Sequence, residues 1–159
     1  MTKPRLKNAG MAAPAAVQAL QAFTAAVDDY GLPQTIADLV HLRASQINGC
    51  SVCTDMHSRE AKYHGEKDER LFTLAAWRDT PYFNDAERAA LALTEAATRI
   101  NDRPDAVPDD VWDEAARHYD ERALTALVVH IAAINAWNRM SVTTRQLAGE
   151  WTARVAQAA

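Results

Sequence analysis

Apolar side chains recur every three or four residues along most of this chain, and this spacing restricts the fold more than any other feature. The first such run follows Pro14, lies on one helical face and is expected to end at Gly31; its members are Val17, Leu20, Phe23, Val27 and Tyr30. No stretch of useful length alternates as a half-buried strand does. We therefore expect an all-α fold, a single-domain bundle of about seven or eight helices.

The composition supports a helical domain and argues against several functions. Hydrophobic residues make up 48% of the 159 residues, and only 5 are glycine. The net charge is −4 and Lys and Arg form no patch, so no binding to nucleic acid is expected. No apolar run approaches the ~20 residues that a membrane-spanning helix needs. We expect a cytoplasmic protein with a flexible tail over residues 1–13 and one helical domain over 14–159.

Turn signals divide the first half of the chain into further helices. Pro33 is well placed at the start of the second helix, which Asn48-Gly49 should end. The next helix is then expected over 50–64, and another over 67–78.

Capping signals organise the second half. Asn84 and Glu87 have the spacing of a capping box at the start of an alanine-rich helix. The most apolar helix is expected to begin near 124 and to end within 135–139, and the composition of 143–156 is again helical.

The only two cysteines lie close together in a helical pattern with a histidine. Cys50 and Cys53 are three residues apart, and His57 follows four residues after the second. These offsets place the three side chains on one helical face. Because Asn48-Gly49 breaks the preceding helix, the pair should lie at a helix N-terminus, where free N–H groups and the helix dipole stabilise a thiolate.

Such a dithiol can reduce a peroxide. One thiolate attacks the peroxide and becomes a sulfenic acid, and the second thiol condenses with it to a disulfide. The helix end favours Cys50 as the attacking thiol, whereas the imidazole of His57, one turn away, favours Cys53. We predict Cys53 as the nucleophile and Cys50 as the resolving thiol.

Two other interpretations of the cysteine pair stay open at this point. Cys-x-x-Cys with a histidine could be part of a zinc site whose fourth ligand is His41, His64 or Asp38, although the chain has no second Cys/His pair. The two thiols could also be buried and inert. A c-type haem is excluded because Thr54, not histidine, follows the second cysteine.

Three segments resemble the AhpD-like alkylhydroperoxidases of the carboxymuconolactone decarboxylase superfamily. They read DLVHLRASQINGCSVCTDMH at 38–57, ERAALALTEA at 87–96 and INAWNR at 134–139. The resemblance implies an all-helical fold, homo-oligomers that are often trimers or hexamers, and peroxide reduction through the cysteine pair. We expect a peroxide as the substrate, a dithiol as the reductant, and no metal or other cofactor.

The resemblance also assigns roles to residues. Cys53 matches the sulfur that becomes sulfenic acid, Cys50 the partner thiol and His57 the relay histidine. The relay carboxylate, usually a glutamate, falls on Asp38, which is one methylene shorter. Val52 stands where well-known members carry a second histidine.

Two alternative functions follow from the same scaffold. A lyase of the carboxymuconolactone decarboxylase type would not need the cysteine pair. A non-enzymatic metal-binding or structural oligomer would keep its thiols reduced and inert.

The other histidines receive structural interpretations. We expect His41 to be an exposed polar residue and His64 to interact with the dipole at a helix end. His130 is expected in the core or in a subunit interface.

Overall fold

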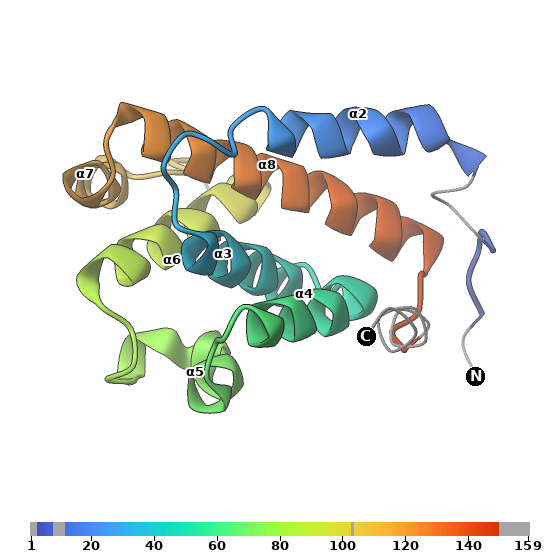
Figure 1. Ribbon diagram of the computed structural model, residues 1–159, viewed down its shortest axis with the longest axis horizontal. Helices are drawn as coiled ribbons and strands as arrows, with labels where there is room; N and C mark the ends of the chain where they lie inside the picture. Colours follow the sequence, from blue (N-terminus) through green and yellow to red (C-terminus); the bar gives the residue numbers. More distant parts are fainter. Residues whose placement is uncertain (1–2, 8–11, 103, 150–159) are drawn as a thin grey trace.

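The computed structural model describes residues 3–7, 12–102 and 104–149, and this part of the chain is all-α, as predicted (Figure 1). Its α-helices are α2 (Pro14–Ala25), α3 (Gln34–Ile47), α4 (Ser51–Tyr63), α5 (Asp68–Thr73), α6 (Asp85–Thr98), α7 (Asp109–His118) and α8 (Glu121–Thr144). Two short 3-10 helices, η1 (Leu74–Asp79) and η2 (Ile100–Asp102), follow α5 and α6. None of these helices is long and apolar enough to cross a membrane.

Helix α3 lies at the centre of the bundle and packs against α4, α6 and α8. Because neighbours cover it on several sides, α3 buries even polar side chains, among them Asp38, Arg43 and Ser45. Helix α2 lies along α8, and α7 packs against α6. This arrangement holds α4, which carries the cysteines, against both α3 and α8.

The apolar core consists of two clusters that share α3 and α6. The larger includes Ile36 and Val40 of α3, Leu93 of α6, and Leu127 and Ile131 of α8. The smaller joins α3 and α6 to η1 and the loop before α6, with members Leu39, Leu42, Leu74, Trp77, Phe83 and Leu91. Removing these side chains from water supplies the main driving force for folding.

The segment 67–78 is not the single helix that was predicted. Helix α5 is short and continues as η1, inside which Ala76 leaves helical geometry (φ −118°, ψ 30°). Residues three apart lie above one another in a 3-10 helix, so Leu74 and Trp77 can both enter the core. Trp77 then donates a hydrogen bond from Nε1 to Glu95 Oε1 at 2.9 Å.

Helix α8 does not end within 135–139 as predicted. Asn135 and Asn138 lie within the helix and are buried in the bundle. Asn135 Nδ2 donates to Thr98 Oγ1 and Asn138 Nδ2 to Ser45 Oγ, both at 3.1 Å. These partners come from other helices, which the local sequence cannot indicate.

The prediction of a separate helix over 143–156 is also wrong in the part that the structure describes. Thr143 and Thr144 belong to the last turn of α8. Arg145 then adopts a left-handed backbone conformation (φ 54°), which ends the helix. Residues 150–156 lie outside the described part of the chain.

Two helices begin where the sequence predicted, but α2 ends earlier than predicted. The capping box is confirmed: Glu87 N donates to Asn84 Oδ1 at 2.9 Å and Asn84 N to Glu87 Oε2 at 2.8 Å. Helix α3 begins directly after Pro33. Helix α2, however, ends at Ala25, not near Gly31, because a turn follows it and carries Val27 into the core.

The described N-terminal residues contact the end of α8. Arg5 N donates to Thr144 O at 2.8 Å, and Gln146 Nε2 donates to Leu6 O at 2.9 Å. Residues 1–2 and 8–11 are outside the described part, so the division into a tail and a domain stays a prediction.

Gly49 makes the turn from α3 to α4, and we expect Gly49→Ala to lower the free energy of unfolding by about 1 kcal/mol. Its φ is +66°, a value that strains a residue with a Cβ, although no atom lies within 4 Å of the added methyl group. Urea unfolding of the wild-type chain and of Gly49→Ala measures the difference in the free energy of unfolding. Gly49→Asn is the control, because asparagine tolerates this conformation better, and an equal loss in both variants would contradict the explanation.

Candidate active site

Cys50 and Cys53 lie at the N-terminus of α4, where the sequence predicted them. Cys50 is the N-cap residue, and its Sγ accepts a hydrogen bond from Cys53 N at 3.3 Å. The two sulfurs form a disulfide, with the Cα atoms 5.3 Å apart. Cys50 is 1% and Cys53 3% exposed, so the pair is shielded from bulk solvent.

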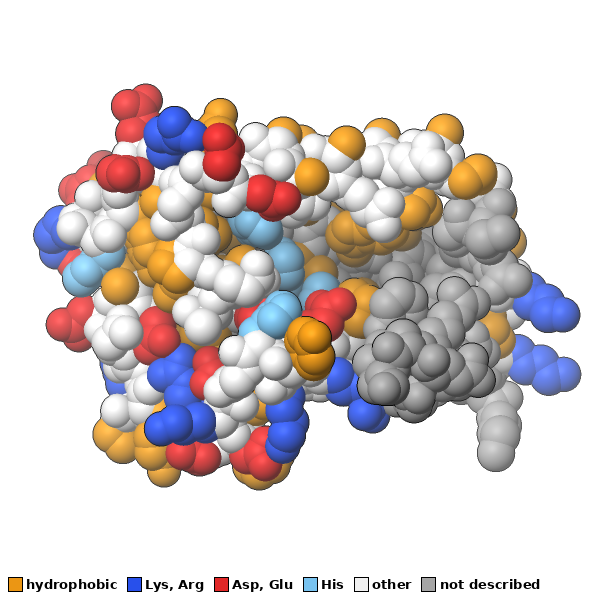
Figure 2. Space-filling view, in the orientation of Figure 1, with side chains coloured by type: hydrophobic (Ala, Val, Ile, Leu, Met, Phe, Trp, Pro, Cys, Tyr) orange, Lys and Arg blue, Asp and Glu red, His pale blue; other side chains and the backbone are white. Residues whose placement is uncertain are grey.

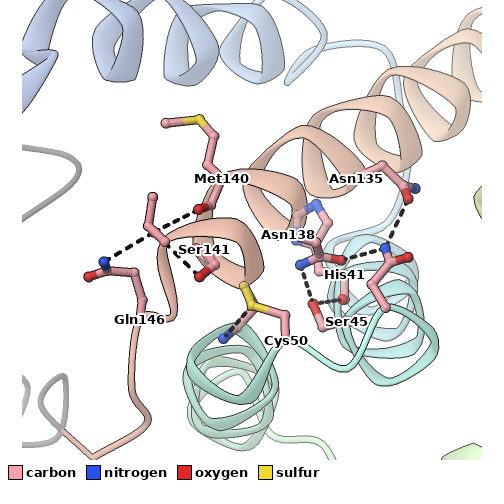
Figure 3. The surroundings of a disulfide bond; sticks show 11 residues. His41, Ser45, Cys50, Asn135, Asn138, Met140, Ser141 and Gln146 are labelled. Carbon is pink, nitrogen blue, oxygen red and sulfur yellow. Dashed lines mark hydrogen bonds between the residues drawn. A yellow bond between two sulfur atoms is a disulfide. The ribbon is translucent and has the colours of Figure 1, made fainter. Parts of the chain in front are cut away.

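A hydrogen-bonded network of amides fixes the turn before the cysteines. Asn48 Nδ2 donates to Asn135 Oδ1 and Asn138 Oδ1, each at 2.9 Å. Figure 3 shows Asn138 of α8 reaching Ser45 of α3 beside the turn that leads to Cys50. Buried polar groups that are paired in this way tie α3 and α8 to the start of α4.

His57 lies one turn after Cys53 on the inner face of α4 and is 8% exposed. Its Nδ1 is 2.7 Å from Glu60 Oε2. When a carboxylate binds Nδ1–H, the other ring nitrogen, Nε2, is left unprotonated and able to accept a proton. Glu60 was not among the predicted site residues, although its spacing of three residues from His57 is typical of a contact on a helix.

Asp38 is buried on α3, but His57 is not its partner. Its Oδ1 accepts from Gln34 Nε2 at 2.9 Å, and its Oδ2 is 2.8 Å from His64 Nδ1. Among the described residues no hydrogen bond joins Asp38 directly to His57, and the role of Asp38 as the relay carboxylate stays a prediction. His64, expected only to interact with the helix end, is instead the hydrogen-bond partner of Asp38.

His41 is not the exposed residue that was expected. It is half-buried between α4 and α8, with its ring centroid 4.9 Å from that of His57 and 5.1 Å from that of His130. Its Nε2 lies 3.0 Å from His130 Nδ1. Histidine side chains gather in the middle of the face shown in Figure 2.

The surroundings of the two paired histidines disfavour a positive charge. Burial lowers the pKa of His41 well below its usual value, and repulsion by His57 and His130 lowers it further. Burial also lowers the pKa of His130, against the attraction of Asp28 and Asp38. His41 is therefore neutral near pH 7.

A cavity of about 500 Å³ opens onto these groups. Cys53, His57, Glu60 and His41 line it, and α2 and α8 provide the facing wall. The rest of the lining is mostly apolar and includes Val17, Val52, Met56, Ala133, Ile134 and Trp137. A smaller pocket of about 270 Å³ adjoins Cys50.

The geometry offers no support for a zinc site. Over residues 3–7, 12–102 and 104–149, no group of three or more His, Cys, Asp and Glu side chains is arranged to hold a metal ion. His64 and Asp38, two of the proposed fourth ligands, are paired with each other.

The fold and the site together define an AhpD-like all-α protein with a cysteine pair at the start of a helix. Residues 14–96 match the model of the carboxymuconolactone decarboxylase family. This chain belongs to that family.

Curated relatives support the assignment. The chain is 39% identical over 109 residues to uncharacterized protein YdfG of Bacillus subtilis (strain 168), covering 69% of this chain and 73% of YdfG. It is 34% identical over 104 residues to uncharacterized protein YnjA of Escherichia coli (strain K12), covering 65% of this chain and 56% of YnjA.

Solved structures share the fold. ATU0492 from Agrobacterium tumefaciens, a protein of unknown function suggested to be the antioxidant defence protein AhpD, has a TM-score of 0.84 and 34% identity, covering 92% of this chain and 98% of that one. The debrominase Bmp8 has a TM-score of 0.71 and 23% identity, covering 86% and 73% of the two chains. At that identity the second likeness concerns the fold alone.

Proposed function

We propose that this chain is a thiol-dependent peroxidase that reduces organic hydroperoxides or hydrogen peroxide through a dithiol/disulfide cycle of Cys50 and Cys53. One observation carries the proposal: the two sulfurs are within bonding distance at a helix N-terminus, and Cys53 lines the same cavity as His57. Membership of the carboxymuconolactone decarboxylase family and the similarity to ATU0492 support it.

In the first step Cys53 reduces the peroxide. His57 accepts the thiol proton at Nε2, and the thiolate of Cys53 attacks the outer oxygen of R–O–OH. An S–O bond forms while the O–O bond breaks, with its electron pair moving to the inner oxygen. His57 returns the proton to that oxygen, which leaves as the alcohol, and Cys53 becomes a sulfenic acid.

In the second step Cys50 resolves the sulfenic acid. Its sulfur attacks the sulfur of Cys53, the S–S bond forms, and the hydroxyl group leaves as water with the proton of Cys50. A dithiol then reduces the disulfide by exchange and is itself oxidised to a disulfide. The two electrons that the peroxide gains are those that this reductant loses.

The lining of the cavity favours a substrate with an apolar group. Val17, Met56 and Trp137 offer apolar surface beside Cys53, and removal of such surface from water favours binding of an alkyl or aryl substituent. We therefore expect organic hydroperoxides to react faster than hydrogen peroxide. The assembly into a trimer or hexamer and the cytoplasmic location stay predictions.

The experiment that tests the proposed function traps the sulfenic acid. In Cys50→Ser the resolving thiol is missing, so one equivalent of cumene hydroperoxide should convert Cys53 to a sulfenic acid that dimedone labels. Mass spectrometry of the digested protein locates the label. A chain that consumes no peroxide and carries no label on Cys53 would contradict the proposal.

Glu60 orients His57 in this mechanism, and we expect Glu60→Gln to slow the oxidation of Cys53 about tenfold. A glutamine amide can still bind Nδ1, but it does not stabilise the imidazolium that forms when His57 takes the proton. The rate is measured as loss of free thiol after peroxide is mixed with the reduced protein. The matched control is Glu114→Gln, because Glu114 forms a similar pair with His118 on α7 (3.1 Å); equal losses in both variants would exclude a specific role for Glu60.

A further inference from the structure

The pair formed by His41 and His130 is not used by the mechanism above, yet one of its two rings lines the cavity. His41 comes from α3 and lines the cavity together with Cys53 and His57. His130 comes from α8 and binds His41 from outside the cavity lining, with Nε2 and Nδ1 at 3.0 Å. Two imidazoles from distant parts of the chain are thus joined, and one of them shares the cavity with Cys53.

A hydrogen bond between two ring nitrogens needs one donor and one acceptor. If both rings were fully protonated, both nitrogens would be donors and the contact would be lost. A charge on His41 would also face His57, whose ring centroid is only 4.9 Å away. The arrangement therefore permits one positive charge on the cavity wall, and His57, with Glu60 beside it, is the ring placed to carry it.

We propose that His41 is a second catalytic residue of the proposed peroxidase, an uncharged hydrogen-bond donor to the leaving oxygen of the hydroperoxide, and that His130 is its positioning residue. The assignment rests on the proposed function. When His130 Nδ1–H donates to His41 Nε2, the nitrogen left on His41 is Nδ1, with its proton. As the O–O bond breaks, negative charge develops on the inner oxygen, and Nδ1–H of His41 stabilises it until His57 delivers the proton.

His57 and His41 have different roles in this step. His57 moves the proton between Cys53 and the leaving oxygen, whereas His41 stays neutral and only donates a hydrogen bond. The charged and titratable groups that act on the pair come from several elements: His57 of α4, Asp38 of α3, and Asp28 after α2, while Glu60 contacts His57. Val52 occupies a position between the cysteines, and His41 of α3 is the second imidazole beside His57 in the cavity lining.

The first test compares half-reactions in His41→Asn. We expect this variant to oxidise Cys53 with cumene hydroperoxide about tenfold to a hundredfold more slowly than the wild-type chain. The reduction of its disulfide by dithiothreitol should change less than twofold, because no leaving oxygen takes part in that step. His118→Asn on α7 is the matched control and should leave both rates unchanged.

The second test uses the positioning residue. In His130→Ala, His41 loses the donor that holds its proton on Nδ1, whereas burial and His57 still keep it neutral. Nitrogen-15 NMR of this variant should show the His41 proton shared between Nδ1 and Nε2. The oxidation rate should fall about threefold to tenfold, and the reduction of the disulfide by dithiothreitol should change less than twofold.

A measurement on the wild-type chain does not depend on the folding of any variant. Nitrogen-15 NMR of the histidine rings should show His41 neutral down to pH 5.5, with its Nδ1 protonated. A charged His41 at pH 6, an unchanged His41 tautomer in His130→Ala, or an unchanged oxidation rate in folded His41→Asn would each overturn the assignment. Oxidation of Cys53 in the wild-type chain with no effect of His41→Asn leaves the proposed function standing, whereas no oxidation in the wild-type chain overturns both.

Discussion

A chain in which Cys53 is replaced by serine is expected to reduce hydroperoxides about 1000-fold more slowly than the wild-type chain, or slower still. The serine hydroxyl stays protonated at neutral pH and cannot form the sulfenic acid that the cycle requires. His57 and the cavity remain in place, so the loss reports the sulfur itself. The rate is followed as hydroperoxide consumption in the presence of excess dithiothreitol.

Cys50→Ser distinguishes the roles of the two sulfurs. This variant keeps the attacking thiol and should consume one equivalent of hydroperoxide per chain before it stops. The N-cap position of Cys50 and the hydrogen bond from Cys53 N also stabilise a thiolate on Cys50, so the opposite order of attack is a real chemical alternative. A sulfenic acid trapped on Cys50 in Cys53→Ser would show that the roles are reversed.

The second large effect is expected at Glu95, far from this chemistry. Glu95 is 6% exposed and accepts hydrogen bonds from Arg43 Nε at 2.8 Å, Trp77 Nε1 at 2.9 Å and Arg78 Nη1 at 2.6 Å. It thereby ties α6 to α3 and to η1. Burial alone would raise the pKa of Glu95, but these hydrogen bonds and the charge of Arg43 outweigh burial and hold the pKa below its usual value.

Glu95→Gln is expected to lower the free energy of unfolding by about 3 kcal/mol. The amide can still accept the bond from Trp77, but Arg43 is left as a buried cation without a counter-charge. Arg78 is half-exposed and can turn to solvent, so Arg43 dominates the loss. Urea unfolding at pH 7 measures the difference, and Glu69→Gln, on the exposed face of α5, should change stability by less than about 0.5 kcal/mol.

The stability difference between the wild-type chain and Glu95→Gln is also expected to depend on pH. A carboxylate whose pKa is lowered by folding stabilises the native state above its unfolded value, near 4.5, and this stabilisation is lost as the pH falls through the lower native value. The stability difference between the wild-type chain and Glu95→Gln should therefore shrink below about pH 4.5. A difference that stays constant down to pH 3 would show that packing, not charge, is responsible.

Local patterns predicted the helical elements and the start of the active helix. The capping box at Asn84, the break at Asn48-Gly49 and the placing of Cys50, Cys53 and His57 on one face all depend on contacts within a few residues. Such contacts follow from the spacing of residues along the sequence. The kink inside η1 was missed because the burial of Trp77 against α6 decides it, and nothing in the segment itself shows that partner.

The sequence by itself determined the cysteine pair, the histidine one turn away and the helix that presents them, because helix geometry fixes these relations once the helix forms. Only the tertiary structure decided which groups surround them. It paired Asp38 with His64 and placed Glu60 beside His57. It also brought His41 of α3 against His130 of α8, which lies 89 residues further along the chain. Contacts of this kind depend on the packing of whole helices around α3, and a spacing rule that relates neighbours along one helix carries no information about them.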